Sequence, residues 1–281
     1  MNWAFIFGNW GAPELGVVGA ALATLAVQVA SVLALGLYAG WLPELRRFRL
    51  WQRFWRADPV ALVRVFRLGW PIGLTGLAES GMFQASALMM GWIGTVELAA
   101  HGIAMEVAAL AFMVHLGLSN AVTIRTAHAD GAGDRDAMRD GALVGIALSV
   151  LFGVAMVVLF LAVPEPIIAV FLDMSKPQSA EIVVLGTVLL ALAALFQLGD
   201  AMQVIALGLL RGVQDTRVPM VLAALSYWGV GIPSSYVLAF VLGLGAQGLW
   251  LGLVLGLAFA SVTLMARFWA GYRRRGLVAA E

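Results

Sequence analysis

The chain has 281 residues, of which 62% are hydrophobic and only 12% are charged, and its formal net charge is +1. Soluble domains carry about 25% charged and about 45–50% apolar residues, so this composition excludes an ordinary soluble protein and indicates a chain that crosses a membrane several times. The small net charge gives no indication of nucleic-acid binding. The absence of cysteine excludes disulfides and thiolate metal sites.

Long apolar stretches predict an all-α, polytopic membrane helix bundle. A spanning helix needs about 20 mostly apolar residues, and the sequence contains about seven such stretches. The apolar piece Trp3–Gly8 is too short to span and is typical of the tail of a helix. In chain order, the predicted spans are Leu15–Gly40, Leu68–Trp92, Leu98–Val122, Gly141–Val163, Ile182–Leu210, Pro219–Leu242 and Ala246–Phe268.

The arginines of the connectors lie on alternate sides of the predicted spans. The connectors after the first, third, fifth and seventh spans carry nearly all the basic residues, and the intervening connectors carry only Lys176. Basic loops of membrane proteins stay in the cytoplasm. The pattern therefore predicts a multi-pass protein of the plasma (inner) membrane with a cytoplasmic C-terminus.

A weak internal repeat suggests how the chain is organised. Phe7–Ala23 and Phe240–Gly256 both have the pattern of a helix end, a glycine-rich turn and a glycine-rich helix, and transporters are often built from two repeats. The Arg- and Trp-rich connector is either an amphipathic helix on the membrane surface or a plain basic loop. We expect a remnant of a preceding lobe with one span at 1–43, the cytoplasmic connector at 44–67, a six-helix lobe at 68–270 and a cytoplasmic tail at 271–281.

Three acidic residues, Glu79, Glu106 and Asp200, lie inside predicted spans. A charged side chain near the bilayer centre costs roughly 2.5–3.5 kcal/mol on insertion scales, so such residues usually have a function. For Glu79 and Asp200 we expect a role in coupling transport to a cation. Glu106 is equally compatible with a place in a substrate cavity and with a structural role. The alternative for each acid is a single hydrogen bond between helices.

The neighbours of the acids at helical spacing favour a cation-binding cavity. Phe83 shares a helical face with Glu79, and Gln197 and Gln203 share a face with Asp200, while Phe196 lies one turn before it. Carboxylates supply charge, amides supply hydrogen bonds, and aromatic rings attract cations. These four residues are therefore candidates for a substrate cavity.

The histidines are weaker candidates. We expect His101, near the outer end of its span, to form a hydrogen bond at the membrane interface, and we keep His115 as a candidate cavity residue. No spacing typical of a metal site or of a nucleophile with its base occurs, so we expect neither an enzyme nor a cofactor. Apart from a sodium ion at the two acids, no metal is predicted.

Two further patterns predict structure rather than chemistry. Arg211 and Asp215 are four residues apart at a helix end and could form an ion pair that locks the turn. Gly248, Gly252 and Gly256 form a seam of small residues that is typical of close helix packing.

Several segments resemble the MATE family of multidrug and toxic compound extruders, in its NorM-like branch. They are Arg67–Phe83, Leu98–Asp134 and Leu198–Met220, and residues 1–40 resemble the end of the first half of such a protein. The resemblance implies two six-helix lobes around a central cavity and export of organic cations in exchange for sodium or protons. It also implies that Glu79 and Asp200 match the acids of the C-terminal lobe.

The resemblance leaves other functions open, because most of the first lobe has no counterpart in the chain. The chain could be a transport-incompetent membrane remnant, or a half-transporter that needs a partner lobe or a homodimer. A flippase of lipid-linked glycans from the same superfamily is a third reading, although the absence of Lys and Arg from the span interiors disfavours it.

Overall fold

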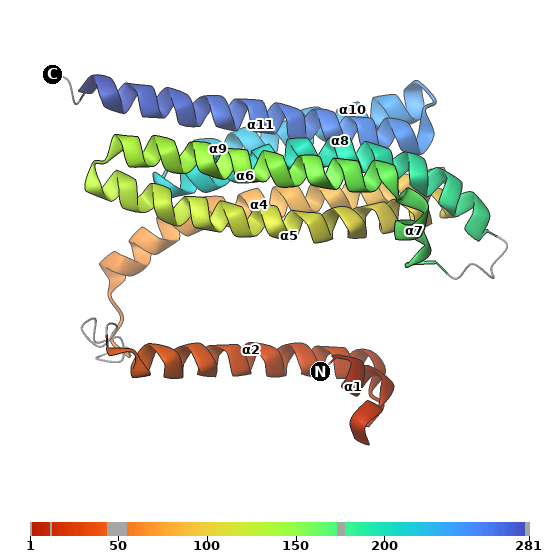
Figure 1. Ribbon diagram of the computed structural model, residues 1–281, viewed down its shortest axis with the longest axis horizontal. Coiled ribbons are helices and arrows are strands. Elements are labelled where there is room, and N and C mark those ends of the chain that lie inside the picture. Colours follow the sequence, from red (N-terminus) through yellow and green to blue (C-terminus); the bar gives the residue numbers. More distant parts are fainter. Residues whose placement is uncertain (1, 12, 44–54, 173–177, 279–281) are drawn as a thin grey trace. The chain divides into compact units, whose positions relative to one another are not determined.

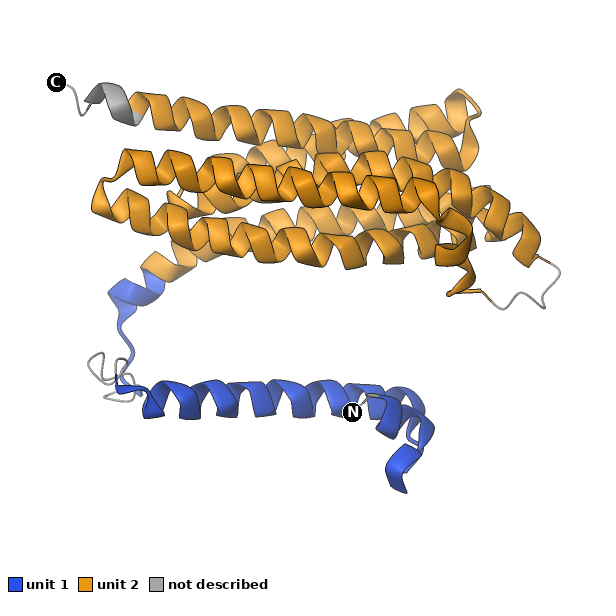
Figure 2. Cartoon of the chain, in the orientation of Figure 1, with its two compact units in different colours: residues 1–63 blue, residues 64–281 orange. Residues whose placement is uncertain are grey.

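The computed structural model describes residues 2–11, 13–43, 55–172 and 178–278, and all their regular secondary structure is helical (Figure 1). The chain divides into two compact units, Met1–Val63 and Arg64–Glu281 (Figure 2). Seven described helices are long and apolar enough to cross a membrane, which confirms the predicted fold class and number of spans. Residues 44–54 of the predicted connector lie outside the described residues.

The first unit contains one membrane-spanning helix. A short helix α1 (Asn2–Phe7) and a single turn η1 (Asn9–Gly11) precede α2 (Gly16–Trp41). The boundaries of α2 agree with the first predicted span to within one residue. Its side chains are almost uniformly apolar, which suits a helix surrounded by lipid.

The second unit is a bundle of long helices that run roughly along one axis (Figure 1). The helix α4 begins within the first unit, so the last part of the predicted connector is helical. The elements are α4 (Pro59–Ile93), α5 (Thr95–Ala132), α6 (Arg135–Ala162), α7 (Pro164–Ala169), α8 (Ser179–Gly212), α9 (Arg217–Ala224), η2 (Leu225–Gly231), α10 (Ile232–Tyr236), η3 (Val237–Val241) and α11 (Gly245–Val278).

Helix α8 lies at the centre of this bundle and packs on α5, α6 and α11. Small residues allow the close approach: Gly208 lies against Ser119 of α5, and Gly212 lies against Thr126. The Ser119 hydroxyl donates a hydrogen bond to the carbonyl of Val204 at 2.7 Å. Packing of small residues and hydroxyl-to-carbonyl bonds stabilise helix pairs in lipid, where hydrophobic burial between helices contributes little. Side chains of α8 are therefore held in fixed positions.

The predicted glycine seam of α11 is confirmed. Gly248 lies against the backbone of Leu238, and Gly252 lies against the backbone of Ser235. Gly256 meets the backbone of Gly231 in the same way. The seam thus brings α11 into backbone contact with the preceding span.

A methyl group in this seam should destabilise the bundle. The Cβ of a Gly252→Ala variant would overlap the backbone nitrogen of Ser235, so the helices would have to separate. Overpacking typically costs about 1–3 kcal/mol. The matched control is Gly271→Ala on the same helix, where the added Cβ meets no atom within 4 Å. We expect a lower melting temperature in detergent for Gly252→Ala alone; equal melting temperatures would contradict the packing argument.

The internal repeat appears as the same local geometry in both units. Gly16 and Gly245 begin their helices with φ angles of 54° and 55°, in the left-handed region that favours glycine. The preceding Leu15 and Leu244 donate backbone hydrogen bonds to Phe5 and Leu238, respectively, in the helix before the turn. The two stretches therefore share a helix–turn–helix arrangement, with a longer turn in the first.

The sixth span is irregular. Between Arg217 and Val241 it contains two π-helical segments, η2 and η3, separated by α10. Pro233 lies at the start of α10 and has no N–H group to donate to the helix. Single π-helical turns inside helices are often found at functional sites.

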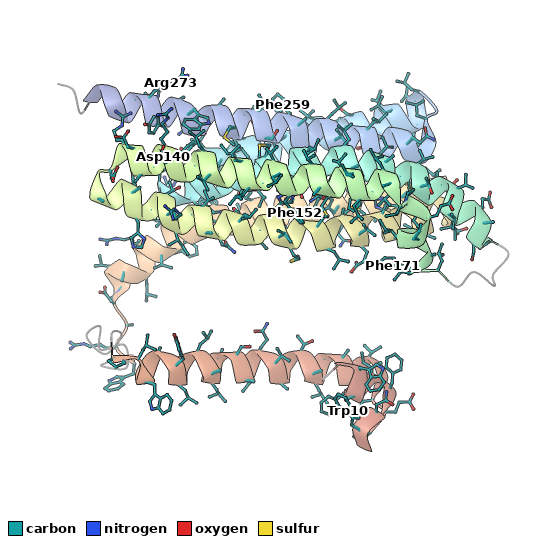
Figure 3. The ribbon with its side chains drawn as sticks, in the orientation of Figure 1. Trp10, Asp140, Phe152, Phe171, Phe259 and Arg273 are labelled. Carbon is teal, nitrogen blue, oxygen red and sulfur yellow. The ribbon has the colours of Figure 1, made fainter. Side chains whose placement is uncertain are left out.

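The basic connectors of the second unit meet at one end of the bundle. The Arg135 guanidinium donates to the carbonyl of Tyr272 at 2.9 Å, and Arg267 pairs with Asp215 at 2.9 Å. In Figure 3, Asp140 and Arg273 lie at this same end, which carries the C-terminus. This convergence is expected if alternate connectors share one side of a membrane.

The predicted pair of Arg211 with Asp215 is wrong. Helix α8 ends at Gly212, and Gln214 adopts a positive φ of 60°. The two residues are therefore not four apart on one helix, and Asp215 turns instead to Arg267 of α11. The spacing was right for a helix, but the helix ends between the two residues.

Candidate functional site

A pocket of about 240 Å³ lies between α4, α5 and α8 in the second unit. Its wall is mostly apolar, and two acidic side chains are its charged groups. The lining residues are Gly76, Glu79, Ser80 and Phe83 from α4, Met105, Ala108, Ala109 and Phe112 from α5, and Phe196 and Asp200 from α8.

The two acids differ in their surroundings. Asp200 lies on the buried central helix, is 2% exposed, and its Oδ1 has no hydrogen-bond partner among the described residues. Glu79 is half-buried and lies near the amide of Gln203. The charge of Glu79 acts on Asp200 across the pocket. Two like charges in one apolar pocket favour the entry of a cation.

A short polar network joins Glu79 to the irregular sixth span. Gln203 Nε2 lies 3.4 Å from Glu79 Oε1 and donates a hydrogen bond to the phenol oxygen of Tyr227. The neighbouring Trp228 donates its indole N–H to the carbonyl of Ala78 at 3.0 Å. The segment η2 therefore reaches α8 through Tyr227 and α4 through Trp228, next to Glu79.

Aromatic rings continue from the pocket into the bundle. Phe83 packs on Phe196 with ring centroids 6.0 Å apart, and Phe196 packs on Trp250 of α11 at 5.6 Å. Trp250 in turn contacts His101 at 5.7 Å. His101 is thus buried in the core rather than at an exposed position, and its Nδ1 has no hydrogen-bond partner among the described residues.

The structure brings Glu79, Asp200, Phe83 and Phe196 to one pocket, and it places Gln203 beside Glu79. Their roles in binding stay predictions. The remaining candidates do not line this pocket.

Gln197, Glu106 and His115 lie elsewhere. Gln197 is buried, and neither side-chain atom has a partner within the described part of the chain. Glu106 is exposed on the outer face of α5. His115 is buried, lies 2.8 Å from the Ser149 hydroxyl, and packs on Phe152, which Figure 3 labels. Helical spacing could not separate these faces, because it does not say which side of α5 meets α8.

Sequence reasoning missed Tyr227, Trp228 and Phe112. Tyr227 is completely buried although it carries a hydroxyl, and a buried tyrosine usually has a polar partner. The position of Tyr227 inside a predicted span was therefore an indication that its hydroxyl has a polar partner. The partner itself could not be inferred, because Gln203 and Tyr227 come from different helices.

The pocket combines aromatic and apolar walls with negative charge. Three phenylalanine rings and Met105 form an adaptable wall, and the acids supply negative charge. None of its lining residues is basic. Within the described residues there is no group of three or more histidine, cysteine, aspartate or glutamate side chains that could hold a metal ion.

Comparison with known proteins identifies the family. The family described as MatE matches residues 71–237, which is more than half of the chain and includes the pocket. The chain belongs to the MatE family. This confirms the resemblance of its sequence, and the family is one of transporters.

Two curated relatives illustrate the similarity. The chain is 44% identical over 273 residues to a "Probable multidrug resistance protein NorM" of Rhizobium meliloti (strain 1021), covering 97% of this chain and 58% of the relative. It is 41% identical over 270 residues to a "Multidrug resistance protein NorM" of Burkholderia vietnamiensis, covering 95% and 57%, respectively. The chain therefore spans less than two thirds of the length of these relatives.

Solved structures share the fold of this MatE-family chain. A MATE transporter in its straight conformation matches with a TM-score of 0.82 at 19% identity, covering 98% of this chain and 59% of the other. A eukaryotic MATE transporter matches with a TM-score of 0.77 at 21% identity, covering 98% and 60%. At these identities the likeness concerns the fold.

Proposed function

We propose that this MatE-family chain takes part in cation-coupled export of organic cations, and that Glu79 and Asp200 form the site where a small cation competes with the exported one. The observation that carries the proposal is the position of both acids in one apolar, aromatic-lined pocket. The names of the relatives, multidrug resistance proteins, are compatible with it.

The exchange follows from the charge of the pocket. An organic cation is held by the two carboxylates and by the faces of Phe83, Phe112 and Phe196. When sodium ions or protons neutralise the carboxylates, the attraction for the organic cation falls, and the organic cation leaves. Because each ligand weakens binding of the other, the two are coupled by the same free energy in both directions.

Export also needs access to the pocket from each side of the membrane in turn, which in this mechanism a second lobe provides. If the chain is a half-transporter, the same mechanism applies, and a partner polypeptide supplies the second lobe. A flippase of lipid-linked glycans is disfavoured, because an anionic pyrophosphate group would meet two acids and no basic lining residue.

The experiment separates binding from transport. The purified chain in lipid nanodiscs should bind a fluorescent aromatic cation such as ethidium, and sodium or acid should displace it. Co-expression with the first lobe of a curated relative as a separate polypeptide should then give gradient-driven dye efflux. Efflux without binding would contradict the proposal. Absence of both binding and efflux would also contradict it, and that is the result expected of an inactive remnant.

Membrane orientation is part of the proposal: the arginine-rich end of the bundle faces the cytoplasm of the inner membrane. The chain has no cysteine, so single cysteines can be labelled without background. Leu244→Cys and Gly271→Cys lie toward opposite ends of α11. A membrane-impermeant maleimide should label the first in intact cells and the second only after permeabilisation; the reverse pattern would contradict this orientation.

A further inference from the structure

The Gln203 side chain lies between Glu79 and Tyr227, yet both face the same end of its amide. Its Nε2 lies 3.4 Å from Glu79 Oε1 and also donates to the Tyr227 hydroxyl oxygen. Its Oε1 is buried and has no hydrogen-bond partner among the described residues. The amide therefore uses its donor twice and its acceptor not at all.

A half-turn of the side-chain amide about its terminal C–C bond leaves its shape unchanged and exchanges the positions of its nitrogen and its oxygen. The observed orientation suits an ionised Glu79, which can only accept. The reversed orientation suits a neutral Glu79, because Gln203 Oε1 can then accept from the carboxylic O–H and from the Tyr227 O–H. A phenol can serve as acceptor in the first state and as donor in the second.

We propose that Gln203 is a positioning residue that reverses its amide when Glu79 gains or loses a proton, and that Tyr227 changes from acceptor to donor with it. This inference rests on the proposed function, in which the charge of Glu79 alternates. The reversal gives the carboxyl group a hydrogen bond in both states. Neither state of the cycle then leaves Glu79 as an unpaired polar group, which would otherwise cost free energy.

The surroundings of this amide are tied together beside it. Trp228 donates its indole N–H to the carbonyl of Ala78 at 3.0 Å, so η2 is bonded to α4 next to both Tyr227 and Glu79. The other charged groups that act on Glu79 or Tyr227 are Asp200 and Arg211 of α8. The α5 wall of the pocket adds only apolar side chains.

Nuclear magnetic resonance of the chain in nanodiscs, with ¹⁵N in glutamine side chains and ¹³C in glutamate carboxyl groups, tests the inference. The Gln203 amide signal is identified by its loss in Gln203→Leu, and the Glu79 signal by its loss in Glu79→Gln. On acidification, the Gln203 and Glu79 signals should shift with the same midpoint. Gln197 is the matched control: it is buried on the same helix and has no bond to Glu79, so its signal should not follow that midpoint.

The Glu79→Gln variant tests whether the shift of Gln203 depends on Glu79, and Tyr227→Phe distinguishes a reversing amide from a passive neighbour. In Glu79→Gln the Gln203 signal should stay constant on acidification, and in Tyr227→Phe its shift should shrink because one partner is lost. A constant Gln203 signal beside a shifting Glu79 signal would overturn the reversal and leave the proposed exchange standing. Constant signals from both residues would overturn the reversal and the proton-coupled form of the function together, and dye displacement by sodium would then test what remains of that function.

Discussion

Replacing Glu79 by glutamine is expected to weaken binding of an aromatic organic cation by at least about tenfold. Interactions with charged hydrogen-bonding groups are worth about 1.5–3 kcal/mol, and 1.4 kcal/mol corresponds to a factor of ten in affinity. The substitution keeps the size of the side chain and removes its charge from a pocket whose other walls are largely apolar. Fluorescence titration of the nanodisc-reconstituted chain measures the effect.

The matched control for this variant is Glu106→Gln. Glu106 is an acid on a neighbouring spanning helix, but it is exposed and does not line the pocket. Its neutralisation should leave dye affinity unchanged within a factor of about two, because an interaction that the dye does not make in the pocket contributes nothing to its affinity. Equal losses in both variants would show a nonspecific effect of membrane charge, and an unaffected Glu79→Gln would reject the site.

Replacing Asp200 by asparagine is expected to remove competition between the small cation and the dye. Asp200 is more deeply buried than Glu79 and its Oδ1 has no partner in the described structure, so a bound cation is the group best able to compensate its charge. Without that charge, sodium should no longer displace the dye, and acid should displace it only by protonating Glu79. Displacement curves at several sodium concentrations and pH values measure this loss.

The stability of the same variant provides a second measurement. Because an uncompensated buried carboxylate is costly, Asp200→Asn should melt at or above the temperature of the unaltered chain in the absence of sodium. Asp140→Asn, at the exposed end of α6 (Figure 3), is the matched control and should alter neither displacement nor melting. Retained displacement by sodium in Asp200→Asn would assign the competition to Glu79 alone.

Much of the fold could be predicted because membrane helices leave a strong local pattern. The first span was placed within one residue of α2, since its ends coincide with the ends of the apolar stretch. Boundaries were less accurate where helices extend beyond the membrane. Helix α4 begins at Pro59 rather than near Leu68, because its first turns are amphipathic and carry arginines that hydropathy alone counts against a span.

The candidate site was only partly predictable. Helical spacing placed Phe83 beside Glu79 and Phe196 beside Asp200, because residues three and four apart share a face. It could not reveal which faces meet, so Glu106 and His115 were included although they do not line the pocket. It could not find Tyr227 either, whose partner Gln203 comes from a different helix.

The sequence by itself determined that this protein is a helical membrane protein, how many times it can span, and which family it belongs to, because apolar length and local motifs are properties of contiguous residues. Only the tertiary structure decided that Glu79 and Asp200 share a pocket, that Asp215 pairs with Arg267, and that η2 contacts both α4 and α8. These facts depend on the rotation and register of one helix against another, which many weak packing contacts and small residues set together.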